Sequence, residues 1–284
     1  MRNRIRNIFI PLCFFMSLVT LISACNPNSK EKAFEKNRPK TIDQQVFLIG
    51  NGPNSRRTIS DMIEKSGIRT GGYVVIIPTS FNAKDSTAWF LKKEFFNQKI
   101  MAVHILELPP YSSAGAPPVT IKNTDVLSIE NASIICLLNG KKKKFIKLAN
   151  NTRLKESLMK AKENGAVIAG IGKGASILGN YYYNQVIDTI SRKLKISLKP
   201  GLGLLTNTVV DNIGFLRNYK EGIQKNSIKR NFIFIGLGDK ACIWIKNNDA
   251  HVLRKPKIGL IAPGKPKKTY GKEARFKLLP QEAK

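Results

Sequence analysis

The most constraining feature of the sequence is a set of short, almost entirely apolar runs that are rich in β-branched residues. They occupy residues 73–78 (YVVIIP), 133–138 (SIICLL) and 166–169 (AVIA). Runs without alternating polar residues are typical of strands that are buried on both faces of a parallel sheet. Helical patterns lie at 86–98 and 154–164. This alternation predicts an α/β fold of three layers, with a mainly parallel sheet and helices on both of its faces.

The last part of the chain departs from this alternation. Residues 232–235, 241–245 and 251–253 are short apolar runs with no helical segment between them. Their close spacing predicts antiparallel strands at one side of the sheet. We expect a single α/β domain over residues 46–262. The segment 263–284 is basic and contains Pro and Gly, and it is predicted to be a tail.

The N-terminus has the pattern of an export signal. Three arginines in the first six residues precede an apolar run at 8–21, which is too short and too interrupted for a membrane span. The sequence of residues 21–25 (LISAC) resembles the bacterial lipobox, in which the cysteine is lipidated and becomes the new N-terminus. The resemblance implies a signal peptide at 1–24 and a lipid anchor on Cys25. An ordinary signal peptide and an uncleaved anchor are the alternatives.

The segment between the lipobox and the domain is polar. Residues 25–45 begin with the lipidated Cys25 and have almost nothing to bury, which is typical of a flexible tether. Asn26 follows the cysteine. In the enterobacterial sorting rule an Asp at that position retains a lipoprotein in the inner membrane, so its absence favours the outer membrane. The sequence therefore predicts a lipid-anchored protein of the cell envelope, facing the periplasm or the surface.

The chain is strongly basic, with 48 Lys and Arg against 19 Asp and Glu and a formal net charge of +29. Nucleic acid is the usual partner of such a surface, but an exported lipoprotein rarely meets it. Anionic phospholipid, lipopolysaccharide, and acidic envelope polymers or peptides fit the compartment better. The alternative is that the lysines only keep the protein soluble. The sharpest local concentration of charge is the run from Lys141 to Lys144.

Cysteine and metal-ligand patterns give little sign of further chemistry. Cys136 and Cys242 lie inside apolar runs, so buried thiols are predicted rather than a disulfide. The sequence has no C-x-x-C, no H-E-x-x-H and no acidic loop of the EF-hand type. No metal and no cofactor is expected.

Several segments together resemble one family, the cyanophycinase and dipeptidase E serine peptidases. Residues 167–179 (VIAGIGKGASILG) resemble the family's nucleophile elbow, VIAG-T-S-A-G-A-S-I-M-G. Residues 132–148 resemble the segment ending F-x-G-G-D/N-Q-L, which helps to form the oxyanion hole, and residues 201–218 resemble G-L-G-L-L…D-Q-H-F-x-x-R, which supplies the catalytic His. Further matches are VFLIGNG, VVIIPTS and FIGLGDKACIWI, so the resemblance runs in order over 46–253. It implies a fold like that of the class I glutamine amidotransferases, which is also flavodoxin-like.

The departures from the family pattern fall on the residues that the resemblance would make catalytic. Gly172 stands at the position of the nucleophilic Ser, and Gly tolerates the positive φ of an elbow turn. Ile213 stands at the position of the His, with Asn212 or Gly214 there if the match slips by one residue. Asn139 replaces one Gly of the oxyanion segment. The vestigial cleft is therefore expected to contain Asn139, Gly140, Lys141, Gly172, Lys173, Gly174 and Asp211.

Three interpretations follow from this pattern. The first is an inactive relative of a serine peptidase that binds anionic ligands or envelope partners. The second is an active hydrolase of the family in which Ser176, with His104 or His251, has taken over catalysis. The third is a purely structural or interaction protein with a vestigial cleft. The sequence leaves the ligand and the oligomeric state open.

Overall fold

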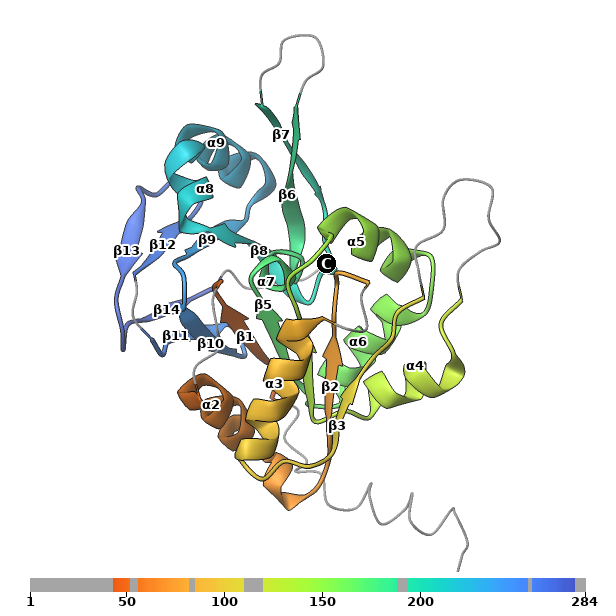
Figure 1. Ribbon diagram of the computed structural model, residues 1–284. Coiled ribbons are helices and arrows are strands. Elements are labelled where there is room, and N and C mark those ends of the chain that lie inside the picture. Colours follow the sequence, from red (N-terminus) through yellow and green to blue (C-terminus); the bar gives the residue numbers. More distant parts are fainter. Residues whose placement is uncertain are drawn as a thin grey trace, which may run out of the picture. The chain divides into compact units, whose positions relative to one another are not determined.

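The computed structural model describes residues 43–51, 56–81, 85–109, 120–187, 194–254 and 257–278 (Figure 1). The predicted signal peptide, Cys25 and the tether up to residue 42 lie outside these residues. Within the described part, the helices are all too short or too polar to cross a membrane.

The larger of two sheets has eight strands in the order β14-β11-β10-β1-β5-β4-β2-β3. The strands β1, β5, β4, β2 and β3 pair in parallel, whereas β10, β11 and β14 are added antiparallel at one side. Both the mainly parallel sheet and the antiparallel strands predicted at 241–245 and 251–253 are confirmed. The bounds are β1 (Gln45–Ile49), β2 (Val74–Ile77), β3 (Val103–Ile105), β4 (Ile134–Leu137), β5 (Val167–Ile171), β10 (Cys242–Lys246), β11 (Asp249–Val252) and β14 (Arg275–Lys277).

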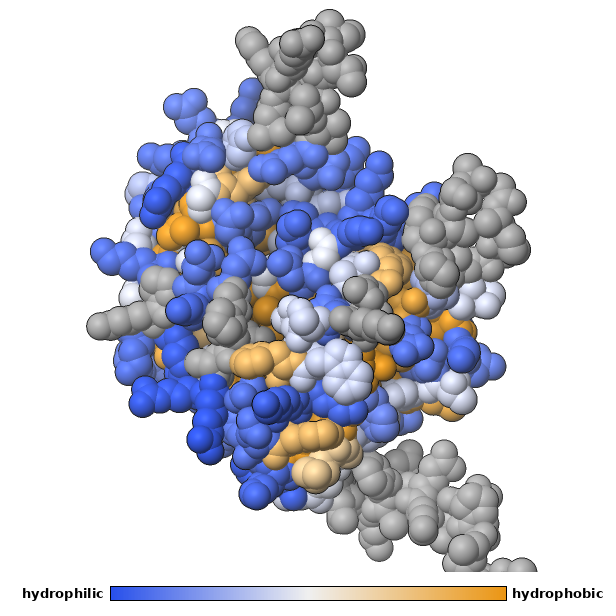
Figure 2. Space-filling view, in the orientation of Figure 1, coloured by the Kyte–Doolittle hydropathy of each residue, from blue (hydrophilic) through white to orange (hydrophobic). Residues whose placement is uncertain are grey.

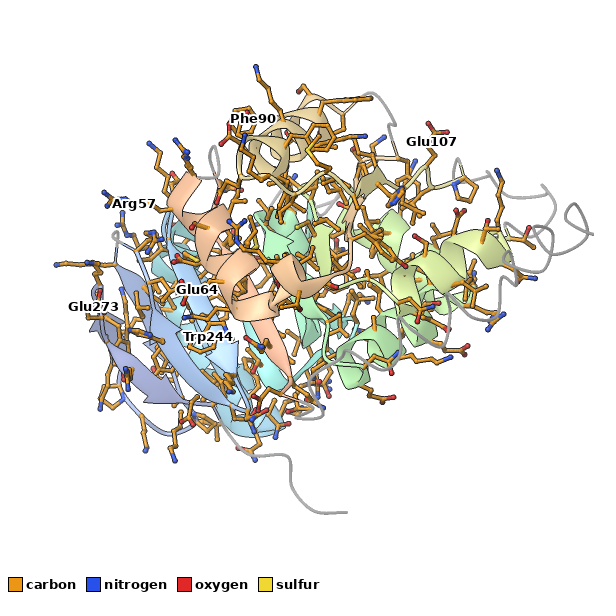
Figure 3. All side chains as sticks on the ribbon, turned by 90° about the horizontal axis from the view of Figure 1, so that it is seen from below. Arg57, Glu64, Phe90, Glu107, Trp244 and Glu273 are labelled. Atoms are coloured by element: carbon orange, nitrogen blue, oxygen red, sulfur yellow. The ribbon has the colours of Figure 1, made fainter. Side chains whose placement is uncertain are left out.

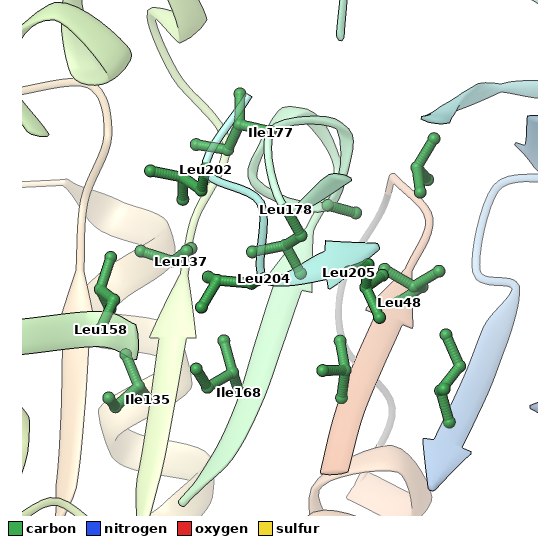
Figure 4. Packing of buried hydrophobic residues seen from close by; sticks show 14 of the residues in the cluster. Leu48, Ile135, Leu137, Leu158, Ile168, Ile177, Leu178, Leu202, Leu204 and Leu205 are labelled. Carbon is green, nitrogen blue, oxygen red and sulfur yellow. The ribbon is translucent and has the colours of Figure 1, made fainter. Parts of the chain in front are cut away.

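Helices cover both faces of this sheet because the parallel strands are apolar on both sides. In β2, Val74 and Ile76 face one cluster, while Val75 and Ile77 face the other. The first cluster is closed by α2 (Arg56–Ser66) and α3 (Ser86–Asn97), and the short helix η2 (Ile68–Thr70) follows α2. The second is closed by α4 (Asn123–Glu130), α5 (Lys142–Asn150) and α6 (Leu154–Glu163), as Figure 4 shows for Leu158 of α6 above Ile135 and Ile168. The predicted three-layer arrangement is thus present.

A partly buried tryptophan, Trp244 of β10, packs next to α2 at one side of the large sheet. The indole nitrogen of Trp244 on β10 donates to Gln45 Oε1 at 3.0 Å, and Lys65 Nζ lies 5.1 Å from the ring centroid. Figure 3 shows Trp244 beside Glu64 of α2, and Phe90 on the outer side of α3, where it is 43% exposed. These contacts close the edge of the core where the antiparallel strands begin.

A second sheet was not expected from the sequence. It has six strands in the order β13-β12-β9-β8-β6-β7, and α8 (Ile213–Asn218) and α9 (Lys220–Arg230) pack near it. The run at 232–235, predicted to join the antiparallel strands at one side of the first sheet, lies instead mostly in β9 of the second sheet, which pairs in parallel with β8 and antiparallel with β12. The aromatic run at 181–183 lies in the long strand β6. The bounds are β6 (Gly179–Ile187), β7 (Leu194–Pro200), β8 (Leu205–Asn212), β9 (Ile233–Leu237), β12 (Ile258–Ile261) and β13 (Lys268–Tyr270).

The C-terminal segment also differs from the expected tail. From residue 263 to Leu278 the chain contributes β13 to the second sheet and β14 to the first. The rings of Tyr270 and Phe276 pack in a tilted arrangement with their centroids 5.0 Å apart, and Leu278 is only 4% exposed. This segment has no apolar pattern in the sequence, because Phe276 stands between the exposed Arg275 and Lys277, and Tyr270 stands between Thr269 and Gly271.

Candidate functional site

A cavity of about 860 Å³ lies at the carboxyl ends of β1, β4 and β5, where ligands bind in open α/β sheets. The second sheet supplies the opposite wall through β6, the end of β8 and α8. In the orientation of Figure 2 the surface over α5, at the rim of this cavity, is largely hydrophilic. Its lining comprises Gly50, Asn51, Asn139, Gly140, Lys141, Lys142, Lys143, Lys144, Gly172, Lys173, Tyr183, Asn184, Gln185, Asp211, Asn212, Gly214, Phe215, Asn218 and Leu237.

The structure brings six of the seven expected cleft residues together in this cavity. They are Asn139, Gly140, Lys141, Gly172, Lys173 and Asp211. Gly174 does not line it, because this glycine lies against the strand behind the turn. A Cβ on Gly174 would meet the carbonyl oxygen of Leu137 at 2.1 Å, so the position requires glycine for packing. The sequence places Gly174 near the cleft, but it does not show whether this residue lines the cavity or lies behind the cavity wall.

The turn at Gly172 has the shape of a nucleophile elbow. It joins β5 to the one-turn helix α7 (Lys173–Ser176), and Gly172 has φ 57° and ψ −118°. Its N–H donates to Ile49 O at 2.9 Å, which fixes the turn against β1. An elbow of this kind projects the side chain of its central residue into the site. Here the backbone of the elbow is present, and the side chain that would carry a nucleophile is absent.

The groups around the elbow also fill the place of an oxyanion. In hydrolases with an elbow, the N–H of the residue after the nucleophile is one of the donors to the oxyanion. In this chain that donor, Lys173 N–H, is bonded to Asn139 Oδ1 at 3.2 Å. A Cβ on Gly172 would also lie 2.5 Å from Asn51 Oδ1. Two carboxamides therefore occupy the space in which a peptidase would hold its nucleophile and the oxygen of its substrate.

Residues 201–218, which resemble the segment that supplies the catalytic His in the family, contain β8 and α8 in this structure. Asn212, at the end of β8, accepts a hydrogen bond from Phe215 N at 2.7 Å and so caps α8. Asn212 and Gly214 line the cavity, but Ile213 does not. The Cα of Ile213 lies 3.3 Å from where a Cβ on Gly236 would stand, toward the second sheet. None of these three side chains can accept a proton in the manner of an imidazole.

An ion pair crosses the cavity between the two sheets. Lys142 Nζ donates to Asp211 Oδ2 at 3.2 Å and to the carbonyl oxygen of Tyr183 at 3.1 Å. The side chains of Lys142 and Asp211 are 19% and 13% exposed, so the pair is largely withdrawn from water. Lys141 and Lys143 remain exposed on the first turn of α5, and Lys173 is exposed at the elbow. Because Asp211 is paired, the positive charge of the rim is not neutralised by the residues that line the cavity.

The residues proposed for a relocated catalytic centre lie apart. His104 is on β3 and His251 is on β11, near opposite edges of the eight-stranded sheet. His104 packs edge-on against Tyr73, and His251 Nε2 lies 3.3 Å from Glu273 Oε2. Ser176 is 2% exposed, and its hydroxyl donates to a backbone carbonyl of its own short helix at 2.8 Å. These positions give no support to the interpretation of an active hydrolase with Ser176 as its nucleophile.

Both described cysteines are free and buried, as predicted. Burial raises the pKa of the Cys136 and Cys242 thiols to about 12, which leaves them unreactive at neutral pH. Within the described residues, His, Cys, Asp and Glu form no group of three that could hold a metal ion.

Several residues of the cavity wall were missed by the sequence interpretation. Asn51 follows the first strand, so the rule that ligands bind at carboxyl ends of strands could have identified it. Tyr183, Asn184 and Gln185 lie on β6 of the second sheet, whose existence no periodic pattern indicated. Asn218, at the end of α8, likewise reaches the cavity only through the arrangement of that sheet.

A parallel sheet with an elbow turn at its carboxyl edge is typical of α/β hydrolases, and in this chain glycine stands at the elbow. Residues 46–253 match the sequence model of peptidase family S51. The chain belongs to this family. The match spans nearly the same residues as the motifs that resemble cyanophycinase and dipeptidase E.

Solved structures with a similar fold are also peptidases by description. One is a peptidase from an acI-B1 Actinobacterium, with a TM-score of 0.62 and 16% identity over 82% of this chain and 96% of that chain. Another is a putative peptidase E protein from Listeria monocytogenes EGD-e, with a TM-score of 0.50 and 15% identity over 75% of this chain and 100% of that chain. At these identities the likeness concerns the fold. No curated protein matches the chain significantly.

Proposed function

We propose that this member of peptidase family S51 is catalytically inactive and binds an anionic ligand in the cleft at the elbow. The observation that carries the proposal is the hydrogen bond from Lys173 N–H to Asn139 Oδ1 beside a glycine elbow. The nucleophile is absent, the donor to the oxyanion is occupied, and the base position holds no imidazole. Loss of the nucleophile alone removes acyl-enzyme chemistry.

The charge of the cleft supports binding rather than a vestigial role. Lys141 and Lys143 are exposed on the first turn of α5, and Lys173 is exposed at the elbow. That first turn contains no acidic residue, and no side chain caps it. Lysines at the positive end of a helix repel the helix dipole, and a bound anion would relieve this repulsion. A cavity of about 860 Å³ is large enough for a small organic ligand.

The location of the domain is part of the same proposal. The lipobox-like segment ending at Cys25 supports anchoring to the cell envelope, with the outer membrane favoured. Metabolic labelling with a palmitate analogue should mark the wild-type protein. The variant Cys25→Ala should not be labelled and should be released from membranes. Labelling that persists in the variant would remove the lipid anchor from the proposal.

Inactivity and binding are tested separately. A fluorophosphonate probe should not label the purified protein, and stoichiometric labelling would overturn inactivity. Citrate, a small tricarboxylate, should bind at low salt by calorimetry, and the affinity should fall as salt rises. Lys141→Gln with Lys143→Gln should abolish this binding. The matched control Lys93→Gln with Lys122→Gln, at exposed lysines outside the cleft, should leave it unchanged.

A further inference from the structure

We infer that the anionic ligand of this cleft is a saccharide that carries carboxylate or phosphate groups. The inference rests on the proposed binding function and names the class of ligand. It follows from an unusual lining, in which carboxamide side chains are as prominent as lysines. The carboxamides belong to Asn51, Asn139, Asn184, Gln185, Asn212 and Asn218.

Carboxamides match the chemistry of sugar hydroxyls. Each amide group has two N–H donors and one oxygen acceptor, and each hydroxyl both donates and accepts a hydrogen bond. Gln185 and Asn218 are exposed and Asn184 is partly exposed, so these amides are accessible from the cavity. A run of neighbouring hydroxyls would find paired donors and acceptors along this wall. A simple carboxylate or phosphate accepts hydrogen bonds only, and it would use half of this capacity.

The lysines supply the preference for negative charge. Lys141 and Lys143 stand at the amino end of α5, across the cavity from the amides of β6. Asp211, the acidic residue in the lining, is held by Lys142 at 3.2 Å and therefore does not neutralise them. The wall on the side of the first sheet thus offers ammonium groups together with Asn51 and Asn139, whereas the wall formed by β6 and α8 offers amides and contains no lysine of the lining. This division suits a ligand with hydroxyls on one edge and an acidic group on the other.

The same cleft is poorly suited to an extended peptide. Peptides commonly bind by adding a strand to an open sheet edge. Every strand that reaches this cavity, however, already has two neighbours: β1, β4 and β5 in the first sheet, and β6, β8 and β9 in the second. The backbone donor that would receive a peptide carbonyl, Lys173 N–H, is occupied by Asn139 Oδ1. Main-chain recognition is therefore blocked, whereas side-chain recognition of hydroxyls is available.

The test compares ligands that differ in charge and in their hydroxyl groups. Calorimetric titrations at low salt would use trigalacturonate, trehalose 6-phosphate, neutral maltotriose, the peptide triaspartate and citrate. Trigalacturonate or trehalose 6-phosphate should bind at least tenfold more tightly than triaspartate and than maltotriose. Which of the two binds better distinguishes carboxylated from phosphorylated sugars. Triaspartate binding as tightly as both saccharides would overturn the inference and leave the anion-binding cleft intact. Failure of every anion, citrate included, would overturn both.

Variants separate the amide wall from the lysine wall. Asn184→Ala with Gln185→Ala should weaken the favoured saccharide about tenfold and leave citrate affinity unchanged. The control Asn150→Ala, an exposed amide near the other end of α5, should change neither. Equal weakening of saccharide and citrate by the β6 variant would show that the amides only support the fold of the cleft. That result would also overturn the inference.

Discussion

Substitution of the elbow glycine tests the geometry on which the site depends. Gly172→Ser would restore the side chain of a serine peptidase at φ 57° and ψ −118°. A residue held outside the favoured regions of φ and ψ costs about 1–3 kcal/mol. In addition, the new Cβ would stand 2.5 Å from Asn51 Oδ1 and 3.3 Å from Asn139 Cγ. The first contact is with the far end of a flexible side chain, so Asn51 can move away at modest cost.

The expected result is a folded but less stable protein. With about 2–4 °C of Tm for each kcal/mol in a domain of this size, Gly172→Ser should lower Tm by roughly 2–12 °C. Gly67→Ser is the matched control, because Gly67 has φ 64° and a Cβ there would meet nothing within 4 Å. It should report the cost of a left-handed backbone alone, about 1–2 kcal/mol. In the background of Asn51→Ala the cost of Gly172→Ser should fall, since the closest contact is removed.

The same variant should gain no activity. Asn139 would still occupy Lys173 N–H, and no imidazole would lie beside the new hydroxyl. We therefore expect no fluorophosphonate labelling of Gly172→Ser after overnight incubation. An unchanged Tm would contradict the strained geometry of the elbow, and clear labelling would contradict the loss of the base and of the oxyanion donor.

Three further predictions concern the rest of the domain. Cys136 and Cys242 should not react with a disulfide reagent in the native protein, because both thiols are buried. After denaturation, the exported protein should show two reactive thiols if Cys25 is lipidated and three if Cys25 is free. Burial lowers the pKa of Lys162 from 10.5, so the charged form of this lysine opposes folding at neutral pH. The free energy of unfolding in urea should therefore increase as the pH rises toward 10.5, and this increase should be absent in Lys162→Met. Asp85 accepts hydrogen bonds from two backbone N–H groups at the start of α3, and Asp85→Ala should cost about 1 kcal/mol in thermal unfolding.

The parallel part of the fold was predictable because each of its strands and helices has a recognisable pattern within its own short segment of sequence. The strand at 74–77 lacks polar residues, and α3 and α6 begin and end close to the predicted positions. The second sheet was not predictable in the same way. Its strand β6 (GNYYYNQVI) is rich in Tyr and Asn, and it pairs with β8 across the intervening strand β7 of the sequence, a pairing that no local pattern indicates. Buried tyrosines there replace the β-branched residues that make a strand recognisable.

The candidate site was predictable where backbone geometry determined the residue type. Gly172 could be placed at a positive φ because residues 167–179 resemble the nucleophile elbow of the family. By contrast, the role of Asn139 required coordinates. A substitution of Gly by Asn in an oxyanion segment can open, block or distort the donor, and only the 3.2 Å contact with Lys173 N–H identifies blocking. Likewise, the sequence places Asn212 beside the base position, but the hydrogen bond to Phe215 N reveals its role as a helix cap.

The departures from the family pattern at Gly172 and Asn139 lie beside one another at the elbow. Their arrangement supports the proposed binding function. A site that had simply decayed would be free to accumulate any side chain, including apolar residues that close the cavity. Instead, the position of the nucleophile became glycine, and the oxyanion donor is satisfied by an internal amide. Lys173 is exposed, and its N–H already has a partner within the chain, Asn139 Oδ1 at 3.2 Å. The cavity remains about 860 Å³ in volume, with exposed lysines at its rim. An open and polar cleft whose elbow donor is paired within the chain supports the proposal that this member of the family binds a ligand without cleaving it.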